Sequence, residues 1–520
     1  MTCHFIHRLL STTVMLFAVC GAFAQSSPIV KAQTEAGLVE GVIEGNLAVY
    51  KAIPYAAPPV GNLRWKAPQP VKPWKGIRET TEYGPWPPQL SRREGKVKMS
   101  EDCLYLSVLT PAHSESEGLP VMVWIHGSSF QTEWYGATQW DNLAKRGLVI
   151  VNIEYRTGAL GFMAHPALAK EDPHGHCGNY GLLDQIYALQ WVQRNISHFG
   201  GDPSKVTIFG ESAGATSVSM LCASPLAKGL FRAAICQSGA NFYPTADKRV
   251  WHITNHTMKG AEQQGVDSQH HLKAKSLKEM RGMPADKLVG DSVGFYGFWP
   301  CVDGYVIMGD QRQLYDEGKY NDVPVILMSN SDEGVMFTHE WDPKDYEMFI
   351  REKYTFAADS MLALYPGRTR EECYDNFANI WRDVAYGWPE YAWACRQSKT
   401  GKAPVYMAFL SQWTRPSYVG ARRRHGVSHV DELFFLNDKF PHLNRHGRFD
   451  VEEHLGQLMQ DYWVNFAKTG NPNAQGLPYW TPFEADKPTT MEFNRGAHLI
   501  NRPNKEYIDF WDHFFSHWKY

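Results

Sequence analysis

The stretch Lys205-Val-Thr-Ile-Phe-Gly-Glu-Ser-Ala-Gly-Ala-Thr-Ser-Val-Ser219 decides the fold. It begins with a short apolar, β-branched run, passes through residues 210–214 and continues in residues that can form a helix. A serine between two glycines, placed between a strand and a helix, is typical of the G-x-S-x-G nucleophile elbow, whose sharp turn exposes the hydroxyl. The pattern predicts Ser212 as a nucleophile at the end of a buried strand.

A second match to the same pattern occurs at residues 290–294, with Ser292 at its centre. A helix-like segment precedes Ser292, and the residues after it, Phe295-Tyr-Gly-Phe-Trp-Pro300, cannot open a helix. Because the elbow needs a strand before the serine and a helix after it, we interpret Ser292 as a chance match in a loop.

Apolar, β-branched runs recur along the chain and indicate strands buried on both faces. Residues 182–192 have the three-to-four spacing of apolar residues that is typical of an amphipathic helix. This alternation predicts an α/β fold with a large, mostly parallel twisted sheet flanked by helices. Residues 240–320 and 335–400 are expected to form helical or irregular insertions. The runs lie at residues 120–125, 148–153, 205–209, 233–236, 323–328 and 404–409.

The composition is that of an ordinary globular protein. The 520 residues carry a formal net charge of −3, with 43% hydrophobic and 21% charged residues. The near-neutral charge gives no basic surface for nucleic acid, and the lack of a second long apolar run excludes a multi-span membrane protein. Neither a repeat nor a Gly/Ser linker divides the chain, so we expect a single domain over residues 25–520.

The N-terminus has the pattern of a signal peptide. His7 and Arg8 precede an apolar stretch over residues 9–23, and Ala22-Phe-Ala24 fits the small-x-small cleavage pattern. The alternatives are a membrane anchor and a buried helix, but the stretch is short for a bilayer span. We expect residues 1–24 to be removed and the mature protein, without a transmembrane anchor, to be secreted or periplasmic.

A serine hydroxyl is a weak nucleophile, so a histidine base and an orienting carboxylate are expected later in the chain. In this architecture the order is serine, acid, histidine. Asp332 and Glu333 follow the run at 323–328, and His429 follows the run at 404–409 after a loop. Both positions lie beyond the carboxyl ends of predicted strands, where ligands bind in open α/β sheets. The residues alone leave Asp332 and Glu333 as alternatives.

Backbone amides are expected to stabilise the charge that develops on a substrate oxygen during acyl transfer. In this type of fold one donor is the residue after the nucleophile, here Ala213. Further donors come from the loop after an early strand, and Gly127, Ser128 and Ser129 follow the run at 120–125. These four residues form the predicted oxyanion hole.

Ordered blocks along nearly the whole mature chain resemble the type-B carboxylesterase/cholinesterase-like family of the α/β-hydrolase superfamily. The resemblance implies the α/β-hydrolase fold and ester hydrolysis with Ser212 as nucleophile, Glu333 as acid and His429 as base. The blocks are Ile53-Pro-Tyr-Ala-Ala-Pro-Pro-Val-Gly61, Leu63-Arg-Trp65, Ser100-Glu-Asp-Cys-Leu-Tyr-Leu106, Gly178-Asn-Tyr-Gly-Leu-Leu-Asp-Gln185, Phe199-Gly-Gly-Asp-Pro203 and Phe466-Ala-Lys-Thr-Gly-Asn-Pro472.

The resemblance also implies two structural ion pairs, Arg64 with Glu101 and Arg156 with Asp184. The chain departs from the family pattern at its disulfides. A tryptophan stands where the usual partner of Cys103 is found, so Cys103 is expected to be a buried thiol.

The oxyanion loop departs from the family pattern as well. Where the family has glycines after His-Gly, this sequence has Ser128 and Ser129. Serine restricts the backbone more than glycine does and takes more room on the acyl side, although its N–H remains a donor. The two serines are expected either to slow turnover by displacing the donors or to add hydroxyl donors.

We therefore expect an exported serine carboxylic-ester hydrolase that acts on a small-molecule or lipid-like ester through an acyl-enzyme, with no metal, no organic cofactor and no nucleic-acid partner. Two alternatives stay open: a cholinesterase-like binding protein with impaired catalysis, and lipase- or amidase-type activity on the same three residues. The sequence sets no expectation for the oligomeric state. Aromatic side chains that line an apolar pocket, or else pack in the core, are Phe130, Trp134, Tyr135, Phe298 and Trp299.

Overall fold

The computed structural model describes most of the chain, with short gaps. The described residues are 27–90, 98–132, 140–248, 250, 253–290, 297–412, 418–419, 422–423, 426–438 and 450–517. The predicted signal segment and Ser292 lie outside these ranges.

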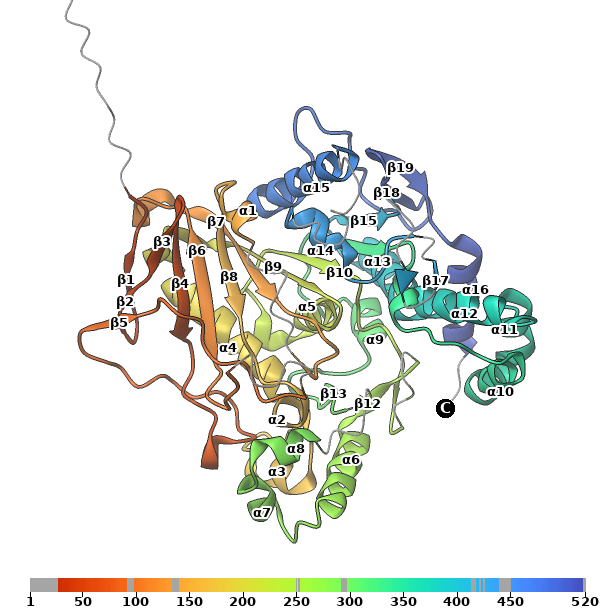
Figure 1. The fold of residues 1–520 in the computed structure, drawn as a ribbon, viewed down its shortest axis with the longest axis horizontal. Helices are drawn as coiled ribbons and strands as arrows, with labels where there is room; N and C mark the ends of the chain where they lie inside the picture. Colours follow the sequence, from red (N-terminus) through yellow and green to blue (C-terminus); the bar gives the residue numbers. More distant parts are fainter. Residues whose placement is uncertain are drawn as a thin grey trace, which may run out of the picture.

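An eleven-stranded sheet forms the centre of the fold (Figure 1). Its strands are β3 (Val42–Glu44), β4 (Leu47–Pro54), β6 (Tyr105–Thr110), β7 (Leu119–Ile125), β8 (Val149–Ile153), β9 (Gly201–Glu211), β10 (Ala233–Gln237), β14 (Val325–Asn330), β15 (Val405–Leu410), β18 (Thr489–Phe493) and β19 (Ala497–Asn501). They lie in the order β19-β18-β15-β14-β10-β9-β7-β8-β6-β4-β3. The strands from β18 to β8 pair in parallel, and antiparallel pairs complete both edges. The prediction of a large, mostly parallel sheet is confirmed.

The central strands are buried on both faces, as their continuous apolar runs predict. Along β7, Val121 and Val123 belong to one hydrophobic core, and Met122 and Trp124 belong to the other. Successive side chains of a strand point to opposite faces of the sheet, so each face needs a helical layer to cover it.

Helices supply these two layers. The layer on the Val121 side contains α4 (Tyr180–Asn195) and α5 (Ala213–Ala223). The other layer contains α1 (Asp141–Ala144), α14 (Asp431–Leu436) and α15 (Asp450–Thr469). Figure 1 shows the sheet between α4 and α15. The helix predicted at residues 182–192 lies within α4, but it is buried on nearly every side and so is not amphipathic as expected.

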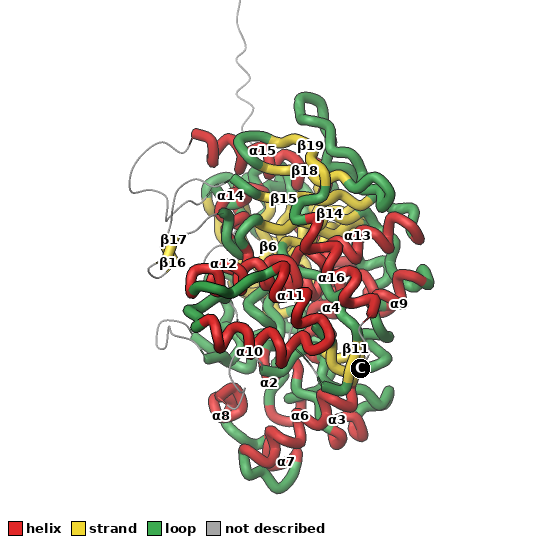
Figure 2. Tube along the Cα trace, turned by 90° about the vertical axis from the view of Figure 1, so that its right-hand side faces the viewer, coloured by secondary structure: helices red, strands yellow, loops and turns green. Residues whose placement is uncertain are grey.

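The first expected insertion combines helices with irregular segments, and the second is largely helical. The first also contains a small parallel sheet of β11 (Thr245–Ala246), β12 (Asn255–Thr257) and β13 (Cys301–Val302). Its helices are α6 (Met258–His271), α7 (Leu277–Arg281), α8 (Ala285–Gly290) and α9 (Gln311–Asp316). The second contains α10 (Pro343–Tyr354), α11 (Ala358–Leu364), α12 (Arg370–Trp381), a π-helix (Arg382–Gly387) and α13 (Trp388–Thr400). Figure 2 shows α10, α11 and α12 gathered on one side of the molecule with the C-terminal α16 (Lys505–His517).

Both expected ion pairs are present. Asp184 accepts hydrogen bonds from Nε and Nη2 of Arg156, at 2.8 and 2.7 Å, and both side chains are buried. The guanidinium of Arg64 binds both carboxylate oxygens of Glu101.

The cysteines in the described part of the chain are all free thiols, and Cys103 is buried as expected. Burial raises the pKa of the Cys103 thiol well above its ordinary value, which keeps it protonated and unreactive. None of the helices within the described ranges is both long enough and apolar enough to cross a lipid bilayer.

Candidate active site

Ser212 occupies a sharp turn between β9 and α5. Its backbone has φ 56° and ψ −122°, a conformation that few residues other than glycine adopt. The Ser212 N–H donates to the carbonyl oxygen of Gln237 on β10, at 2.9 Å. The Ser212 carbonyl accepts hydrogen bonds from the backbone N–H and the hydroxyl of Thr216. The turn is therefore held from both sides, and this is the geometry that the G-x-S-x-G pattern predicts.

The two glycines of the pattern are required by close backbone contacts. A Cβ atom on Gly214 would lie 2.0 Å from the carbonyl oxygen of Ile125. A Cβ atom on Gly210 would lie 2.5 Å from the carbonyl carbon of Gly214. Because these neighbours are backbone atoms, they cannot give way by a side-chain rotation. The glycines thus let the elbow pack against the end of β7, which carries the predicted oxyanion loop.

His429 and Glu333 form a buried hydrogen-bonded pair. Nδ1 of His429 lies 2.6 Å from Oε2 of Glu333, and both side chains are almost fully buried. The other oxygen of Glu333 accepts from the backbone N–H of Asn330, at 2.7 Å, and from the Ser238 hydroxyl, at 2.5 Å. Three donors therefore fix the carboxylate, which in turn fixes the imidazole ring.

The second nitrogen of His429 faces a residue that the sequence reasoning missed. Nε2 lies 3.1 Å from Oε1 of Glu211, the residue that immediately precedes Ser212. Within the described residues, the Ser212 hydroxyl makes no hydrogen bond to His429. A Cβ atom placed on Gly127 would lie 2.9 Å from Oε2 of Glu211 and 3.1 Å from Cβ of Ser212. Glu211, Ser212 and the oxyanion loop thus meet at one point. The only signal for Glu211 in the sequence is its place inside the pentapeptide.

Several buried carboxyl groups lie near the pair formed by His429 and Glu333. Burial, followed by the charge of Glu333, raises the pKa of Glu211 well above its ordinary value. Burial, together with the neighbouring charges of Glu211 and Glu333, raises the pKa of Glu432 to about 8. Burial also raises the pKa of Glu390 well above the ordinary value. The site therefore holds carboxyl protons at a pH at which exposed glutamates have lost theirs.

Aromatic rings enclose the imidazole. The ring of Tyr386 stacks on His429 with centroids 4.6 Å apart, and the ring of Phe337 lies 5.2 Å away. Tyr386 belongs to the π-helix Arg382–Gly387, and such irregular helical turns are frequent at functional sites. These contacts limit rotation of the imidazole and keep bulk water from it.

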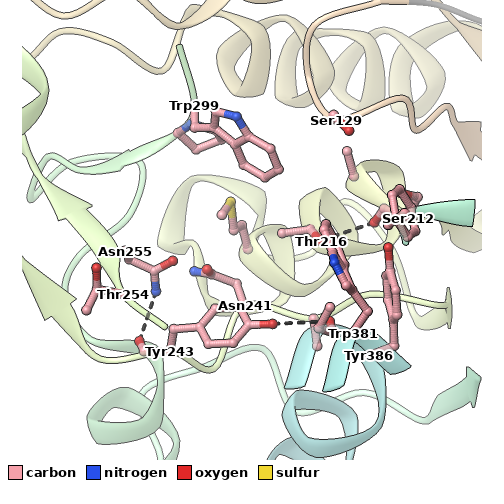
Figure 3. Close-up of a pocket in the computed structure, with 16 residues that line it drawn as sticks. Ser129, Ser212, Thr216, Asn241, Tyr243, Thr254, Asn255, Trp299, Trp381 and Tyr386 are labelled. Atoms are coloured by element: carbon pink, nitrogen blue, oxygen red, sulfur yellow. Dashed lines mark hydrogen bonds between the residues drawn. The ribbon is translucent and has the colours of Figure 1, made fainter. Parts of the chain in front are cut away.

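The predicted oxyanion residues lie beside Ser212. Ala213 is the first residue of α5, so its N–H has no partner inside the helix. Ser128 and Ser129 have φ values of 68° and 57°, and Phe130 continues the series at 60°. The two serines therefore take the left-handed backbone that glycine favours, at a cost in strain. Figure 3 shows Ser129 facing Ser212 across one end of a pocket.

This pocket contains about 680 Å3 of empty space, part of it open to solvent. Of the aromatic residues named from the sequence, Trp299 lines the pocket, whereas Phe130 and Phe298 are buried in the core. Trp134 and Tyr135 lie outside the described residues. The described residues that line the pocket are Ser129, Ser212, Ala213, Thr216, Met220, Ala240, Asn241, Tyr243, Thr254, Asn255, Trp299, Pro300, Phe337, Trp381, Ala385 and Tyr386.

Comparison with known proteins gives a consistent result. Residues 26–511 match the profile of the Carboxylesterase family. The sequence is 33% identical to Fumonisin B1 esterase of Sphingopyxis macrogoltabida, over 90% of this chain and 87% of that protein. It is also 33% identical to Para-nitrobenzyl esterase of Bacillus subtilis (strain 168), over 91% of this chain and 96% of that protein. A solved structure of PNB esterase superposes with a TM-score of 0.79 at 29% identity, covering 93% of this chain and 99% of the other.

The sheet, its helical layers and the elbow at Ser212 define an α/β-hydrolase. With the profile match over nearly the full length, the chain belongs to the carboxylesterase family, type B. It is a carboxylic ester hydrolase, and its substrates are small-molecule esters.

Proposed function

We propose that this enzyme hydrolyses carboxylic esters through an acyl-enzyme on Ser212, with His429 as general base and Glu333 as the residue that orients it. The observation that carries the proposal is the 2.6 Å contact between Nδ1 of His429 and Glu333, next to the strained elbow that exposes Ser212. With Nδ1 held as a donor, Nε2 is the nitrogen available to take a proton.

The first half of the reaction forms the acyl-enzyme and releases the alcohol. The Ser212 hydroxyl oxygen attacks the ester carbon while its proton passes to Nε2 of His429, and the carbonyl electron pair moves onto the substrate oxygen. The N–H groups of Ala213 and of the loop at Gly127, Ser128 and Ser129 stabilise that oxyanion. When the intermediate collapses, the alcohol leaves with the proton from Nε2.

Water then releases the acid by the same route, with His429 as base. This route requires the Ser212 hydroxyl to come within hydrogen-bonding reach of Nε2 when an ester is bound. Such catalytic hydrogen bonds are often formed only in the substrate complex.

Quenched-flow kinetics with a chromogenic p-nitrophenyl ester tests the proposal. We expect an acyl adduct on Ser212 in the acid-quenched enzyme, detected by peptide mass spectrometry. Ser212→Ala should form no adduct and lose turnover while melting at the wild-type temperature. Glu333→Gln should lower kcat by about 10⁴-fold, because the imidazole loses the tautomer it needs. The matched control is the exposed Glu79→Gln, which should change nothing. Wild-type rates in Ser212→Ala would refute the proposal.

We also propose that the enzyme is exported, to the periplasm or the medium, after removal of residues 1–24. The support is the basic start, the apolar stretch and the Ala22-Phe-Ala24 pattern. The mature domain is then residues 25–520. The intact mass of the protein purified from its natural host tests this, since cleavage predicts an N-terminal Gln25.

A further inference from the structure

The end of the pocket away from the nucleophile carries polar groups with a fixed orientation. Figure 3 shows Ser212 and Ser129 at one side and the carboxamides of Asn241 and Asn255 toward the other. Asn255 begins β12, and its backbone N–H donates to the carbonyl oxygen of Pro244, at 2.7 Å. Asn241 lies shortly after the end of β10, and Asn255 lies at the start of β12, so both carboxamides come from the first insertion.

The amino group of Asn241 is held by a chain of hydrogen bonds. Nε2 of Gln311 donates to the carbonyl oxygen of Ser219, at 2.9 Å, which leaves Oε1 of Gln311 as an acceptor. Nδ2 of Asn241 donates to that Oε1, at 3.2 Å. A backbone carbonyl can only accept, so it fixes the orientation of both amides. Oδ1 of Asn241 accepts no hydrogen bond from the described residues.

Asn255 is oriented in the same way. Its Nδ2 donates to the backbone carbonyl of Tyr243, at 2.9 Å, so its oxygen is the atom that faces the pocket, as Figure 3 shows. Oδ1 of Asn255 also accepts no hydrogen bond within the described part of the chain. The pocket thus presents two amide oxygens, both acceptors, from carboxamides whose orientation is fixed because one N–H of each donates to a protein acceptor.

We propose that the part of the ester occupying this pocket carries a hydroxyl group that donates its hydrogen bond to Oδ1 of Asn255, at the end of the pocket where Asn241 also lies. The inference rests on the proposed hydrolysis at Ser212 and specifies its substrate class. A purely apolar chain would displace water from the two amide oxygens and leave them unsatisfied, which disfavours it.

The same observations select a neutral donor over a cationic one. The described residues that line the pocket include no charged side chain. An ammonium group placed there would lose its hydration without a carboxylate to pair with, and such burial of a charge is costly. An anionic group is disfavoured further, because it would face two acceptor oxygens.

The test compares matched p-nitrophenyl esters and alkyl esters that differ by one group, with chain lengths varied on the acyl side and on the alcohol side. Each pair has a hydroxyl or a hydrogen at the chain end, and a third member has an ammonium group. We expect kcat/KM for the best hydroxylated ester to exceed that of its deoxy partner by about 3- to 10-fold, the effect of one neutral hydrogen bond.

Asn255→Leu should abolish this ratio by raising the deoxy rate relative to the hydroxyl rate, and Asn255→Ala serves if the leucine variant folds poorly. The matched control is Asn376→Leu. That amide also donates to a backbone carbonyl, Pro366 O at 2.7 Å, but it does not line the pocket. Its substrate ratio should stay at the wild-type value.

Three results would overturn the inference: equal rates for all hydroxyl and deoxy pairs, a hydroxyl preference that survives in both Asn255 variants, or a preference for the ammonium ester. Failure of every ester to react would instead overturn the proposed function, and this inference with it. Because the readout is a ratio of two substrates on one enzyme, a general loss of stability cannot imitate the expected result.

Discussion

Oε1 of Glu211 lies 3.1 Å from Nε2 of His429, the nitrogen that the proposed mechanism needs as a base. The contact gives Glu211 two roles that depend on pH. As a neutral carboxyl group it can donate to Nε2, and as an anion it stabilises the imidazolium that forms in the transition state. Burial and the charge of Glu333 raise its pKa, so the change between these roles is displaced upward in pH.

Glu211→Gln should therefore match the wild type at low pH and fall behind it as pH rises. The glutamine cannot ionise, so it never supplies the negative charge beside the imidazolium. We expect the ratio of wild-type to variant kcat/KM to grow by about tenfold or more, since an opposite charge at this distance shifts a pKa by about 1–3 units. The control is Glu79→Gln on the surface. A ratio that stays constant over the whole pH range would contradict this role for Glu211.

Ser128→Gly and Ser129→Gly are expected to stabilise the protein. Both serines have φ between 57° and 68°, where a Cβ atom costs roughly 1–2 kcal/mol and glycine has no such cost. The greater freedom of glycine in the unfolded chain offsets part of this, so the free energy of unfolding should rise by up to about 1 kcal/mol.

Turnover of the two variants should stay within a few-fold of wild type, because the backbone donors already have the conformation that glycine favours. Ser398→Gly, inside α13, is the matched control and should lower the free energy of unfolding by about 0.5–1 kcal/mol. Urea denaturation and ester kinetics measure both effects. A large loss of turnover in Ser128→Gly or Ser129→Gly would show that the serine hydroxyls act as donors.

Gly127→Ala should greatly reduce activity while leaving the fold intact. Its Cβ atom would lie 2.5 Å from the carbonyl oxygen of Glu211 and 3.1 Å from Cβ of Ser212, so the loop must move away from the nucleophile. Displacing an oxyanion donor costs about 10²–10³-fold in kcat. At Gly309 a Cβ atom would meet nothing within 4 Å, so Gly309→Ala should remain fully active. Equal activity in the two variants would remove the loop from the mechanism.

Glu432→Gln should change how stability depends on pH. The pKa of Glu432 is raised from 4.5 to about 8. Between these values the folded protein keeps the proton that the unfolded chain has lost. The Glu432 contribution to the free energy of unfolding therefore falls as pH rises, by about 1.4 kcal/mol per pH unit, and this loss ends above the folded pKa. Glutamine does not ionise, so the variant lacks this pH-dependent loss. The difference in free energy of unfolding between Glu432→Gln and wild type should therefore shift in favour of the variant as the pH rises from 4.5 to about 8. Parallel denaturation curves for variant and wild type would contradict the buried, protonated state.

Much of the fold follows from the apolar runs, because central parallel strands are buried on both faces and need no alternation. The strands at the two edges of the sheet were not predicted, because the prediction depended on continuous apolar runs. β4 pairs antiparallel with β6, and β18 pairs antiparallel with β19, so these strands lack the uniform pattern of the centre. Their partners are chosen by tertiary contacts that no local run of residues records.

The pairing of Glu333 with His429 was expected from the motifs and their order and is present, whereas the contact of Glu211 with His429 was not expected. Glu211 is a neighbour of Ser212 in sequence, yet its contact with His429 joins the end of β9 to the loop that precedes α14. The burial of an individual polar residue could not be predicted from the sequence either. Asn195 lies in an N-x-S/T sequence, the acceptor pattern for N-glycosylation, but the residue is only 1% exposed and its amide donates to the carbonyl oxygen of Trp191, so the pattern is not presented at the surface.

The most direct test of the central claim is peptide mapping after reaction with a fluorophosphonate probe. We predict a single stoichiometric phosphonyl adduct on Ser212, formed only while His429 is intact, with no adduct in Ser212→Ala. An adduct on Ser292, the other serine in a matching pentapeptide, or no adduct on a folded wild-type enzyme would contradict the account.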